Sequence, residues 1–325
     1  MKTVEELTSF YYSSLYKSLE KFEEKRKKLR FKIIFILFII FWNMAIVYFF
    51  FFYNKANSTD FLTFFLVAFF ILSSFLFKYF KRDYRNEFKE KIIKPLIKEL
   101  EPNLNYSANL HIQKKDFIDS LLFEKPDKFN GNDFILGQID STKIQFSDVH
   151  AQKRYKDSKG RTKYLTLFQG LFIIADFNKN FQGRTIILPD FAQNAFGDFI
   201  GSWLQSKNQA REELVKMDNP DFEKEFVVYS NDQIEARYIL SHSLMENLLK
   251  FKKKTKHDIS ISFVQNNIHL AINYDKDLFE PTVFKSLLNE EITKEYIETL
   301  VLALSIVEQL KLNERLWSRK EPKNN

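Results

Sequence analysis

The sequence predicts an α+β protein: a two-helix transmembrane hairpin with a helical stalk, followed by a cytoplasmic domain with a mainly antiparallel sheet and flanking helices. Three observations lead to this fold class. Two long apolar runs lie near the N-terminus, cations cluster outside both runs, and strand-like segments follow one another from about residue 103. Strands that follow strands, with helices only later, are typical of an antiparallel α+β sheet.

Residues 1–32 are predicted to form an amphipathic cytoplasmic helix. Its apolar stripe recurs every three or four residues, which places the stripe on one helical face. A similar stripe runs through the predicted juxtamembrane helix, 81–102, which we expect Pro95 to kink or end. We expect the two stripes to pack as a short antiparallel stalk; separate helices on the lipid surface are the alternative. The first stripe consists of Leu15, Leu19, Phe22, Arg26 and Leu29.

Residues 33–53 and 61–80 are the two predicted transmembrane helices, and 54–60 is the short outer loop between them. The first run has one polar side chain, Asn43. As a helix it is about 32 Å long, close to the ~30 Å thickness of the hydrocarbon core. Asn43 and Ser73 should lie at similar depth, so we expect them to hydrogen-bond within the hairpin. A contact between identical hairpins in an oligomer is the alternative.

The cations next to the two apolar runs predict the topology. The charged residues of the outer loop are Lys55 and Asp60, whereas ten cations flank the opposite ends of the spans. Positive residues stay on the cytoplasmic side, so both termini should be cytoplasmic. We also expect these cations to contact lipid head groups. They are Lys25, Arg26, Lys27, Lys28, Arg30 and Lys32 before the first span, and Lys78, Lys81, Arg82 and Arg85 at the end of the second.

Residues 103–317 are predicted to be the cytoplasmic α+β domain, and 318–325 a loose tail. The predicted strands are 134–139, 142–149, 164–175, 185–188, 226–229, 259–263 and 268–274. The last two form a hairpin around an Asn-rich turn. Two helical patterns follow late in the chain, at 234–249 and 292–310. The first should begin with a capping box formed by Ser230 and Gln233.

Composition and charge exclude several kinds of function. The chain has no cysteine, which excludes disulfides, thiolate metal sites and cysteine nucleophiles. Its net charge of +7 comes from the segments that flank the apolar runs, at +4 for 1–32 and +4 for 55–94, whereas 95–325 carries −1. A nucleic-acid-binding domain should carry its excess positive charge in the folded part, so we expect no nucleic-acid partner.

No motif in the sequence predicts catalysis, a metal or a cofactor. Zinc-protease, nucleophile-elbow, phosphate-loop and dinucleotide patterns are absent. Asp176, Asn178 and Asn180 resemble the start of a calcium loop, but the glycine and the final glutamate that such a loop requires are missing. His269 alternates with the apolar residues of its predicted strand, so we expect it to face outward.

Two basic clusters remain, at 153–163 and 250–257. The first places six cations against one Asp around a predicted turn, which favours a solvated hairpin tip. The second follows a predicted helix, where cations complement the helix C-terminus. For both clusters contact with anionic lipid is the functional alternative. The cations of the first cluster are Lys153, Arg154, Lys156, Lys159, Arg161 and Lys163.

Two sequence phrases indicate a family. "FQGLFIIADFNKNFQGRTIILPD" (168–190) and "FVVYSNDQIEARYIL" (226–240), downstream of two apolar runs, resemble a bacterial membrane-protein family known as domain of unknown function 3137. The resemblance extends over most of the chain. It implies a multi-pass protein of the bacterial inner membrane, and it implies no activity and no catalytic residue.

The sequence therefore predicts a membrane-tethered cytoplasmic binding or scaffold module. Its partner at the inner membrane would be a protein, a lipid or a second copy of the chain. An enzyme that acts on a membrane-associated substrate through an unrecognised site is the alternative, because fold and function are only loosely related.

Overall fold

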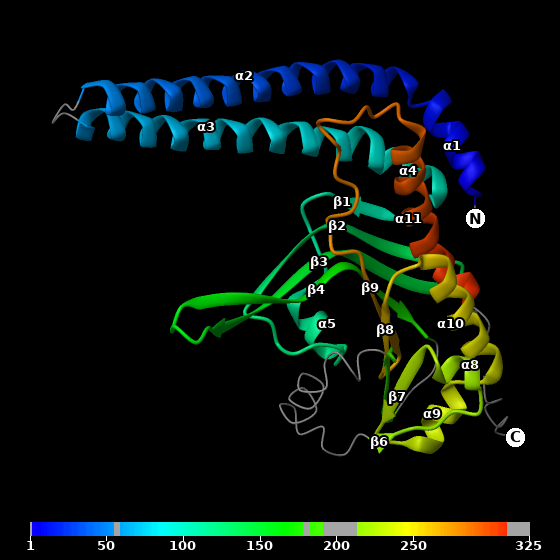
Figure 1. Cartoon of the computed structure of the whole chain (residues 1–325). Coiled ribbons are helices and arrows are strands. Elements are labelled where there is room, and N and C mark those ends of the chain that lie inside the picture. The colour runs from blue at the N-terminus through cyan, green and yellow to red at the C-terminus, as the bar shows by residue number, and fades with distance from the viewer. Residues whose placement is uncertain (1, 55–58, 178–181, 191–212, 311–325) are drawn as a thin grey trace, which may run out of the picture. The chain divides into compact units, whose positions relative to one another are not determined.

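The computed structural model describes residues 2–54, 59–177, 182–190 and 213–310 (Figure 1). The chain divides into two compact units. A helical unit comprises residues 4–96 and 279–297, and a sheet unit comprises residues 1–3, 97–278 and 298–325. The chain passes between the units just before α1, within α4, between residues 278 and 279, and within α11.

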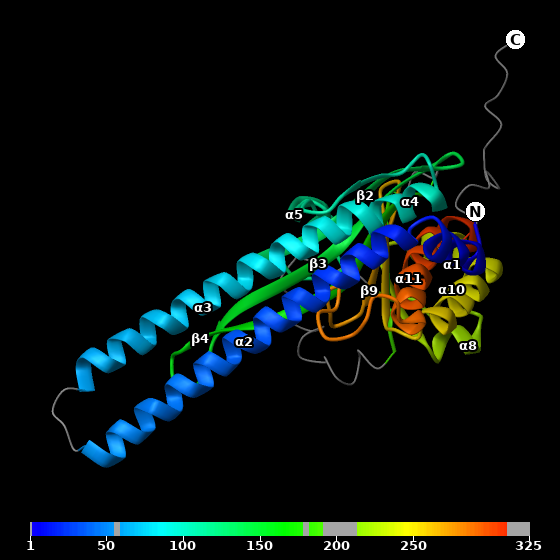
Figure 2. The same cartoon turned by 90° about the horizontal axis from the view of Figure 1, so that it is seen from above.

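The helical unit is built on two long helices that run antiparallel and side by side (Figures 1 and 2). A shorter helix precedes them, and the strand-free segment 279–289 and the start of α11 join them from far along the chain. The helices are α1 (Val4–Ser13), α2 (Tyr16–Asn54), α3 (Thr59–Phe88), the π-helical turn η1 (Lys89–Ile93), α4 (Lys94–Leu100) and α11 (Glu290–Gln309).

The predicted apolar stripes form the interior of this unit. Leu19, Phe22 and Leu29 of α2 are buried, as are Tyr84 and Phe88 of α3. The ring of Phe22 lies 6.1 Å from that of Phe88 and 6.2 Å from that of Tyr84. The two predicted apolar stripes thus pack against each other in the structure.

Pro95 is predicted to kink or end the helix, but in the structure it follows a change of helix type. Proline has no N–H to donate and its ring crowds the preceding turn, which an α-helix cannot accommodate in its interior. In η1, just before Pro95, the N–H of Lys94 donates to the carbonyl of Lys89, five residues back. The wider turn lets the helix continue into α4 instead of breaking.

The sheet unit contains an antiparallel sheet, which confirms the α+β class and the antiparallel sheet of the prediction. Its nine described strands have the order β1-β2-β3-β4-β9-β8-β5-β7-β6, and every pairing is antiparallel. The strands are β1 (Asn105–Ser107), β2 (Lys128–Ile139), β3 (Thr142–Lys156), β4 (Thr162–Asp176), β5 (Arg184–Pro189), β6 (Glu213–Leu214), β7 (Phe226–Ser230), β8 (Ile259–Val264) and β9 (Asn267–Asn273). The helices of this unit are α5 (Lys114–Asp119), α8 (Pro220–Glu223), α9 (Gln233–Ile239) and α10 (His242–Thr255).

Both faces of the sheet are buried. On one face Phe117 of α5 packs against the strands, with its ring 5.0 Å from that of Phe172. On the other face Phe222 of α8 lies 5.0 Å, ring to ring, from Phe226 of β7. A sheet covered on both sides leaves no outward face in its central strands.

This double burial overturns the prediction for His269. Its side chain lies on the α5 face, where the residue is 5% exposed and its ring is 6.4 Å from that of Phe172. Burial lowers its pKa to about 4, so the imidazole is neutral at physiological pH.

The helix predicted over 234–249 is two helices. Asp232, and not Ser230, caps α9 by accepting hydrogen bonds from the N–H groups of Ile234 and Glu235. Ser241 then caps α10 by accepting from Leu244 N–H. Ser230 instead donates its hydroxyl to the carbonyl of Arg184 at 2.9 Å.

Candidate functional site

The outer surface of the helical unit is strongly apolar. Within α2, the segment Tyr16–Ile46 is long and apolar enough to cross a membrane, and it is the one such helix among the described residues. Helices of this kind near an N-terminus occur both as membrane spans and as signal sequences. The exposed large side chains of α2 include Phe31, Phe35, Phe38, Phe41, Trp42, Met44, Tyr48 and Phe49, and those of α3 include Phe70, Ile71, Phe75 and Phe77. A contiguous apolar surface of this extent marks an interaction site.

Asn43 and Ser73, predicted to pair with each other, each bond to their own helix. The side-chain amide of Asn43 donates to the carbonyl of Ile39 at 2.8 Å, and the Ser73 hydroxyl donates to the carbonyl of Phe70 at 3.0 Å. Each side chain therefore has a hydrogen-bond acceptor on its own helix, one turn back.

The juxtamembrane cations fall into two groups. Seven of them are exposed on the helical unit: Lys25, Lys27, Lys28, Arg30, Lys32, Lys81 and Arg82. Lys25 is exposed but paired with Glu87, at 2.5 Å, and the Lys32 ammonium lies 4.4 Å from the centre of the Phe80 ring. The side chain of Lys78 lies outside the described residues. This exposed set has the charge and position to meet anionic head groups.

Arg26 does not belong to that set, because it is 4% exposed and points into the unit. Its guanidinium makes a bidentate pair with Glu23, at 2.8 and 2.7 Å, and donates to the carbonyl of Val283 at 2.7 Å. Glu23 also accepts the N–H of Leu287 at 3.2 Å. The hydrogen bonds from Arg26 hold the pKa of Glu23 below its usual value.

A second ionic contact involves Lys89 and Glu280, which the sequence patterns do not single out. Lys89, 1% exposed, places its ammonium 2.9 Å from the Glu280 carboxylate. Arg85 is 3.7 Å from the same carboxylate oxygen, so it also has an acidic partner within the helical unit. The Tyr296 hydroxyl donates to the backbone carbonyl of Glu280 at 2.5 Å. Together with the Arg26 pair, these contacts fasten the segment 279–289 to the bases of α2 and α3.

One signal for this site was present in the sequence. Arg26 occupies a position of the apolar stripe, with Glu23 three residues before it on the same helix face. A charge on a buried stripe needs a partner. Lys89 and Glu280 carry no comparable signal, because they are 191 positions apart and meet only in the folded unit.

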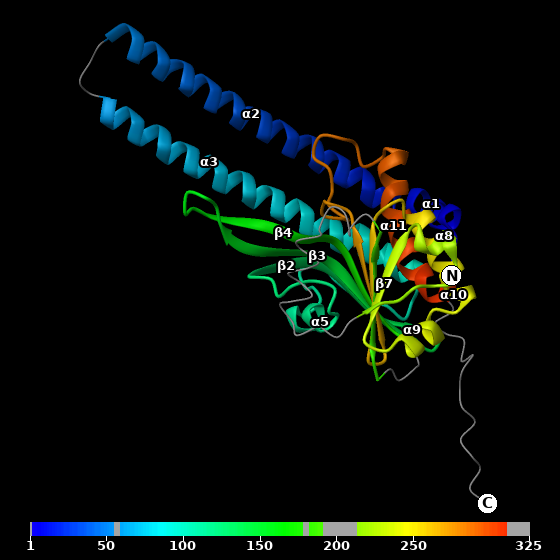
Figure 3. The ribbon, with the colours of Figure 1, turned by 60° about the horizontal axis from the view of Figure 1, so that its bottom comes forward.

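The first basic cluster lies at the end of the long β3–β4 hairpin (Figures 1 and 3). Gly160 has a φ of +74°, as the turn requires. Asp157 accepts the N–H groups of Arg161 and Lys159, both at 2.9 Å, and it also pairs with the Arg161 guanidinium. These bonds, led by the one from the Arg161 backbone, lower the pKa of Asp157.

The remaining cations of the hairpin differ in how they are held. Lys153 is half-buried and lies 3.5 Å from Glu124. Arg154, Lys156, Lys159 and Lys163 are exposed, and Tyr155, Tyr164 and Leu165 are exposed beside them. The structure thus brings five exposed cations, Arg161 included, together with aromatic and aliphatic side chains on one projecting hairpin.

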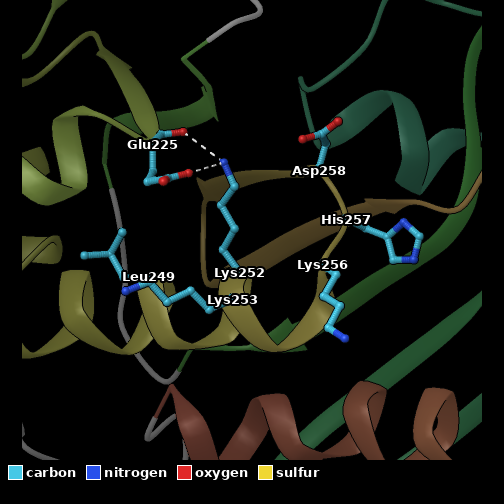
Figure 4. A pocket seen from close by; sticks show the side chains of 7 residues that line it. All are labelled: Glu225, Leu249, Lys252, Lys253, Lys256, His257 and Asp258. Atoms are coloured by element: carbon cyan, nitrogen blue, oxygen red, sulfur yellow. Dashed lines mark hydrogen bonds and ion pairs between the residues drawn. The ribbon is translucent and has the colours of Figure 1, made fainter.

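The second basic cluster borders an open cavity of about 260 Å³ beside α10 (Figure 4). Lys252 is neutralised by Glu225, at 2.6 Å, and Lys256 ends the helix with a φ of +58°. Asp258 adds a second carboxylate to the lining, so the cavity is not a cationic cradle. In the described part of the chain, no three histidine, aspartate or glutamate side chains are grouped to hold a metal ion.

These features define an α+β protein that combines a large antiparallel sheet with an N-terminal apolar helix long enough to cross a membrane. Residues 166–312, from β4 through α11, match the family described as Protein of unknown function (DUF3137). The match confirms the family resemblance that the two sequence phrases indicate.

Other known proteins add little to this assignment. No curated protein matches the chain. The crystal structure of the mycobacterial trehalose monomycolate transport factor A, TtfA, is similar with a TM-score of 0.34 and 11% identity, over 64% of this chain and 91% of that one. A likeness at this level transfers neither fold nor function.

Proposed function

We propose that the chain is a membrane-tethered cytoplasmic binding or scaffold module of the bacterial inner membrane. In this proposal residues 33–53 and 61–80 both cross the bilayer, both termini are cytoplasmic, and the sheet unit works at the membrane surface. The observation that carries the proposal is the exposed apolar surface of α2 and α3, which begins where the buried stripe of the stalk ends.

Length and sequence support two spans rather than one. Residues 61–80 are a second apolar run in the sequence, and a charge-poor loop separates them from the first run. The four cations at the end of α3 match the cluster before the first span, which favours two crossings with the same side inside. The two sequence phrases that resemble the family also favour a bacterial membrane protein.

Attachment of the chain to the membrane would favour binding to a partner at the same membrane. Two partners held at one membrane meet at a raised effective concentration, so a weak contact is sufficient for association. The β3–β4 hairpin is our candidate contact surface, with anionic head groups as its ligand. Each exposed cation near such a surface contributes about 1 kcal/mol, so the five exposed cations could hold the hairpin at the bilayer.

The hairpin contact can be tested in the full-length chain. Because the chain has no cysteine, Ser158→Cys at the turn gives a single site for an environment-sensitive dye. In proteoliposomes with anionic lipid we expect a blue shift of the dye that is absent with zwitterionic lipid alone. Replacing Arg154, Lys156, Lys159 and Lys163 with Gln should abolish the shift.

The control uses the cluster beside α10. Replacing Lys250, Lys253, Lys254 and Lys256 with Gln removes the same charge from the same unit. If that variant and the hairpin variant lose the shift equally, the response reports net charge only, and the hairpin is not the contact surface.

A further inference from the structure

The segment 279–289 is held against the helical unit by buried groups at both of its ends and in its middle. Glu280 pairs with Lys89, the carbonyl of Val283 accepts from Arg26, and the N–H of Leu287 donates to Glu23. In Figure 1 the segment appears as the orange trace that runs beside α2 and α3 before it enters α11. Its position along the two helices is therefore well defined.

The segment meets α2 at the buried pair of Arg26 and Glu23. The Arg26 guanidinium donates to the carbonyl of Val283 at 2.7 Å, and Glu23 accepts the N–H of Leu287 at 3.2 Å. The carbonyl of Leu287 also accepts a hydrogen bond from the Tyr11 hydroxyl at 3.3 Å. Between these contacts lies the turn 282–285, in which the Thr282 hydroxyl donates to the Lys285 carbonyl at 2.9 Å. The turn is therefore held at the level of this ion pair.

Helix geometry gives the depth of this turn. Arg26 precedes Ile33, the first residue of the predicted span, by seven positions, or about 10 Å of helix axis. The head-group layer extends roughly 5–7 Å beyond the hydrocarbon on each side. A side chain that reaches from the turn toward the span therefore enters that layer.

Phe284 is the exposed large apolar side chain of this turn. It is 60% exposed, although Val283 and Leu287 are buried. Lys285 is exposed next to it in the sequence, and Lys27 and Lys28 are exposed on α2, just after Arg26. Phenylalanine together with lysines is the composition of segments that lie in the membrane interface.

We infer that the turn 282–285 is a membrane-interface anchor, in which Phe284 seats in the head-group layer and Lys285 pairs with anionic head groups. The inference rests on the proposed function, because it requires α2 to cross the bilayer. It adds a third lipid contact, close to α11 and far from the two spans in sequence.

Tryptophan fluorescence in proteoliposomes can test this inference without a label. The native tryptophans are Trp42, Trp203 and Trp317. In a Trp203→Phe, Trp317→Phe background, one variant keeps Trp42 as the only emitter. A second variant carries Trp42→Phe and Phe284→Trp, which places the only emitter at the turn. Because Phe284 is exposed, the substitution should leave the fold intact, and circular dichroism checks this.

Lipids brominated at different depths then report the position of each emitter. We expect Trp42 to lose most of its emission with deeply brominated lipid, and the emitter at position 284 to lose most of its emission with lipid brominated near the head group. Quenching of Trp42 without quenching at 284 would overturn the anchor and leave the tether standing. Absence of quenching at both sites would refute the proposed function itself. A response at 284 to protein density but not to bromine would identify contact between two copies and would also overturn the anchor.

Discussion

Arg26→Met should open the segment 279–289, because it leaves the Glu23 carboxylate buried without its partner. The two side chains are 5% and 9% exposed and are joined by a bidentate pair. Removing one member of a buried pair costs about 3–5 kcal/mol, most of it from the uncompensated charge. The carbonyl of Val283 also loses its donor. The total free-energy cost of Arg26→Met exceeds the cost expected for the loss of any exposed ion pair in the unit.

Trypsin cleavage after Lys285 measures this opening. Lys285 lies inside the segment, and a bond in a closed segment is cut only from the open state, so the cleavage rate follows the open population. A loss of about 3–5 kcal/mol raises that population by roughly two to nearly four powers of ten. Mass spectrometry of the full-length chain in mild detergent identifies the cut at this position. We therefore expect cleavage after Lys285 to become at least about 100-fold faster.

Two further variants make the result specific. Lys25→Met removes the exposed pair with Glu87 and should change the cleavage rate less than about fivefold, since surface pairs contribute at most ~1 kcal/mol. Glu23→Gln combined with Arg26→Met removes both charges and should recover most of the loss. Equal cleavage rates for Arg26→Met and Lys25→Met would refute the account of the buried pair.

The remaining predictions concern pH and backbone geometry in the sheet unit. Burial lowers the pKa of His269 from the usual ~6.5 to about 4. Between pH 6.5 and 4 the unfolded chain therefore binds a proton that the folded chain does not. The free energy of unfolding is at its full value above about pH 6.5 and falls by about 3 kcal/mol as the pH drops to 4. Melting curves of the chain in detergent should show this dependence, His269→Asn should reduce it, and His242→Asn, at an exposed site, should retain it; an unchanged dependence in His269→Asn would contradict the assignment. Gly170 has a φ of +152°, and a Cβ there would clash with the Ile272 carbonyl, so Gly170→Ala should cost about 3 kcal/mol or more. Gly160→Ala, at φ +74° in open space, should cost about 1 kcal/mol, and equal melting temperatures for the two variants would be inconsistent with the structure.

The sheet could be predicted from the sequence because its strands follow a pattern set by burial. Alternating and apolar runs marked most of its strands, including the β8–β9 hairpin. Two edge strands, β1 and β6, have three and two residues and carry no recognisable pattern. The prediction for His269 is wrong for a related reason. Alternation predicts that one face of the sheet is exposed to solvent, but α5 covers the face on which His269 lies.

Only the cation clusters and the buried position of Arg26 in the candidate site could be predicted from the sequence. Clusters of cations are visible in a sequence, and their exposure on α2, α3 and the β3–β4 hairpin followed from amphipathic spacing. Arg26 differs from its neighbours only by its position on the apolar stripe, which identifies it as buried once the stripe is recognised. The contacts of Glu280 and Val283 with the helix bases depend on a loop more than 190 residues away in sequence. Such long-range contacts have no local signature.

The central claim, a hairpin that crosses the bilayer twice, can be tested by cysteine labelling in intact cells. The chain has no native cysteine, so Ser58→Cys between the two apolar runs and Ser158→Cys at the β3–β4 turn each give one reactive site. With a membrane-impermeant maleimide, the account predicts labelling at position 58 in cells whose outer membrane is permeable, and labelling at position 158 only after the inner membrane is opened. Labelling at position 158 in unopened cells, or protection of both positions until opening, would contradict it.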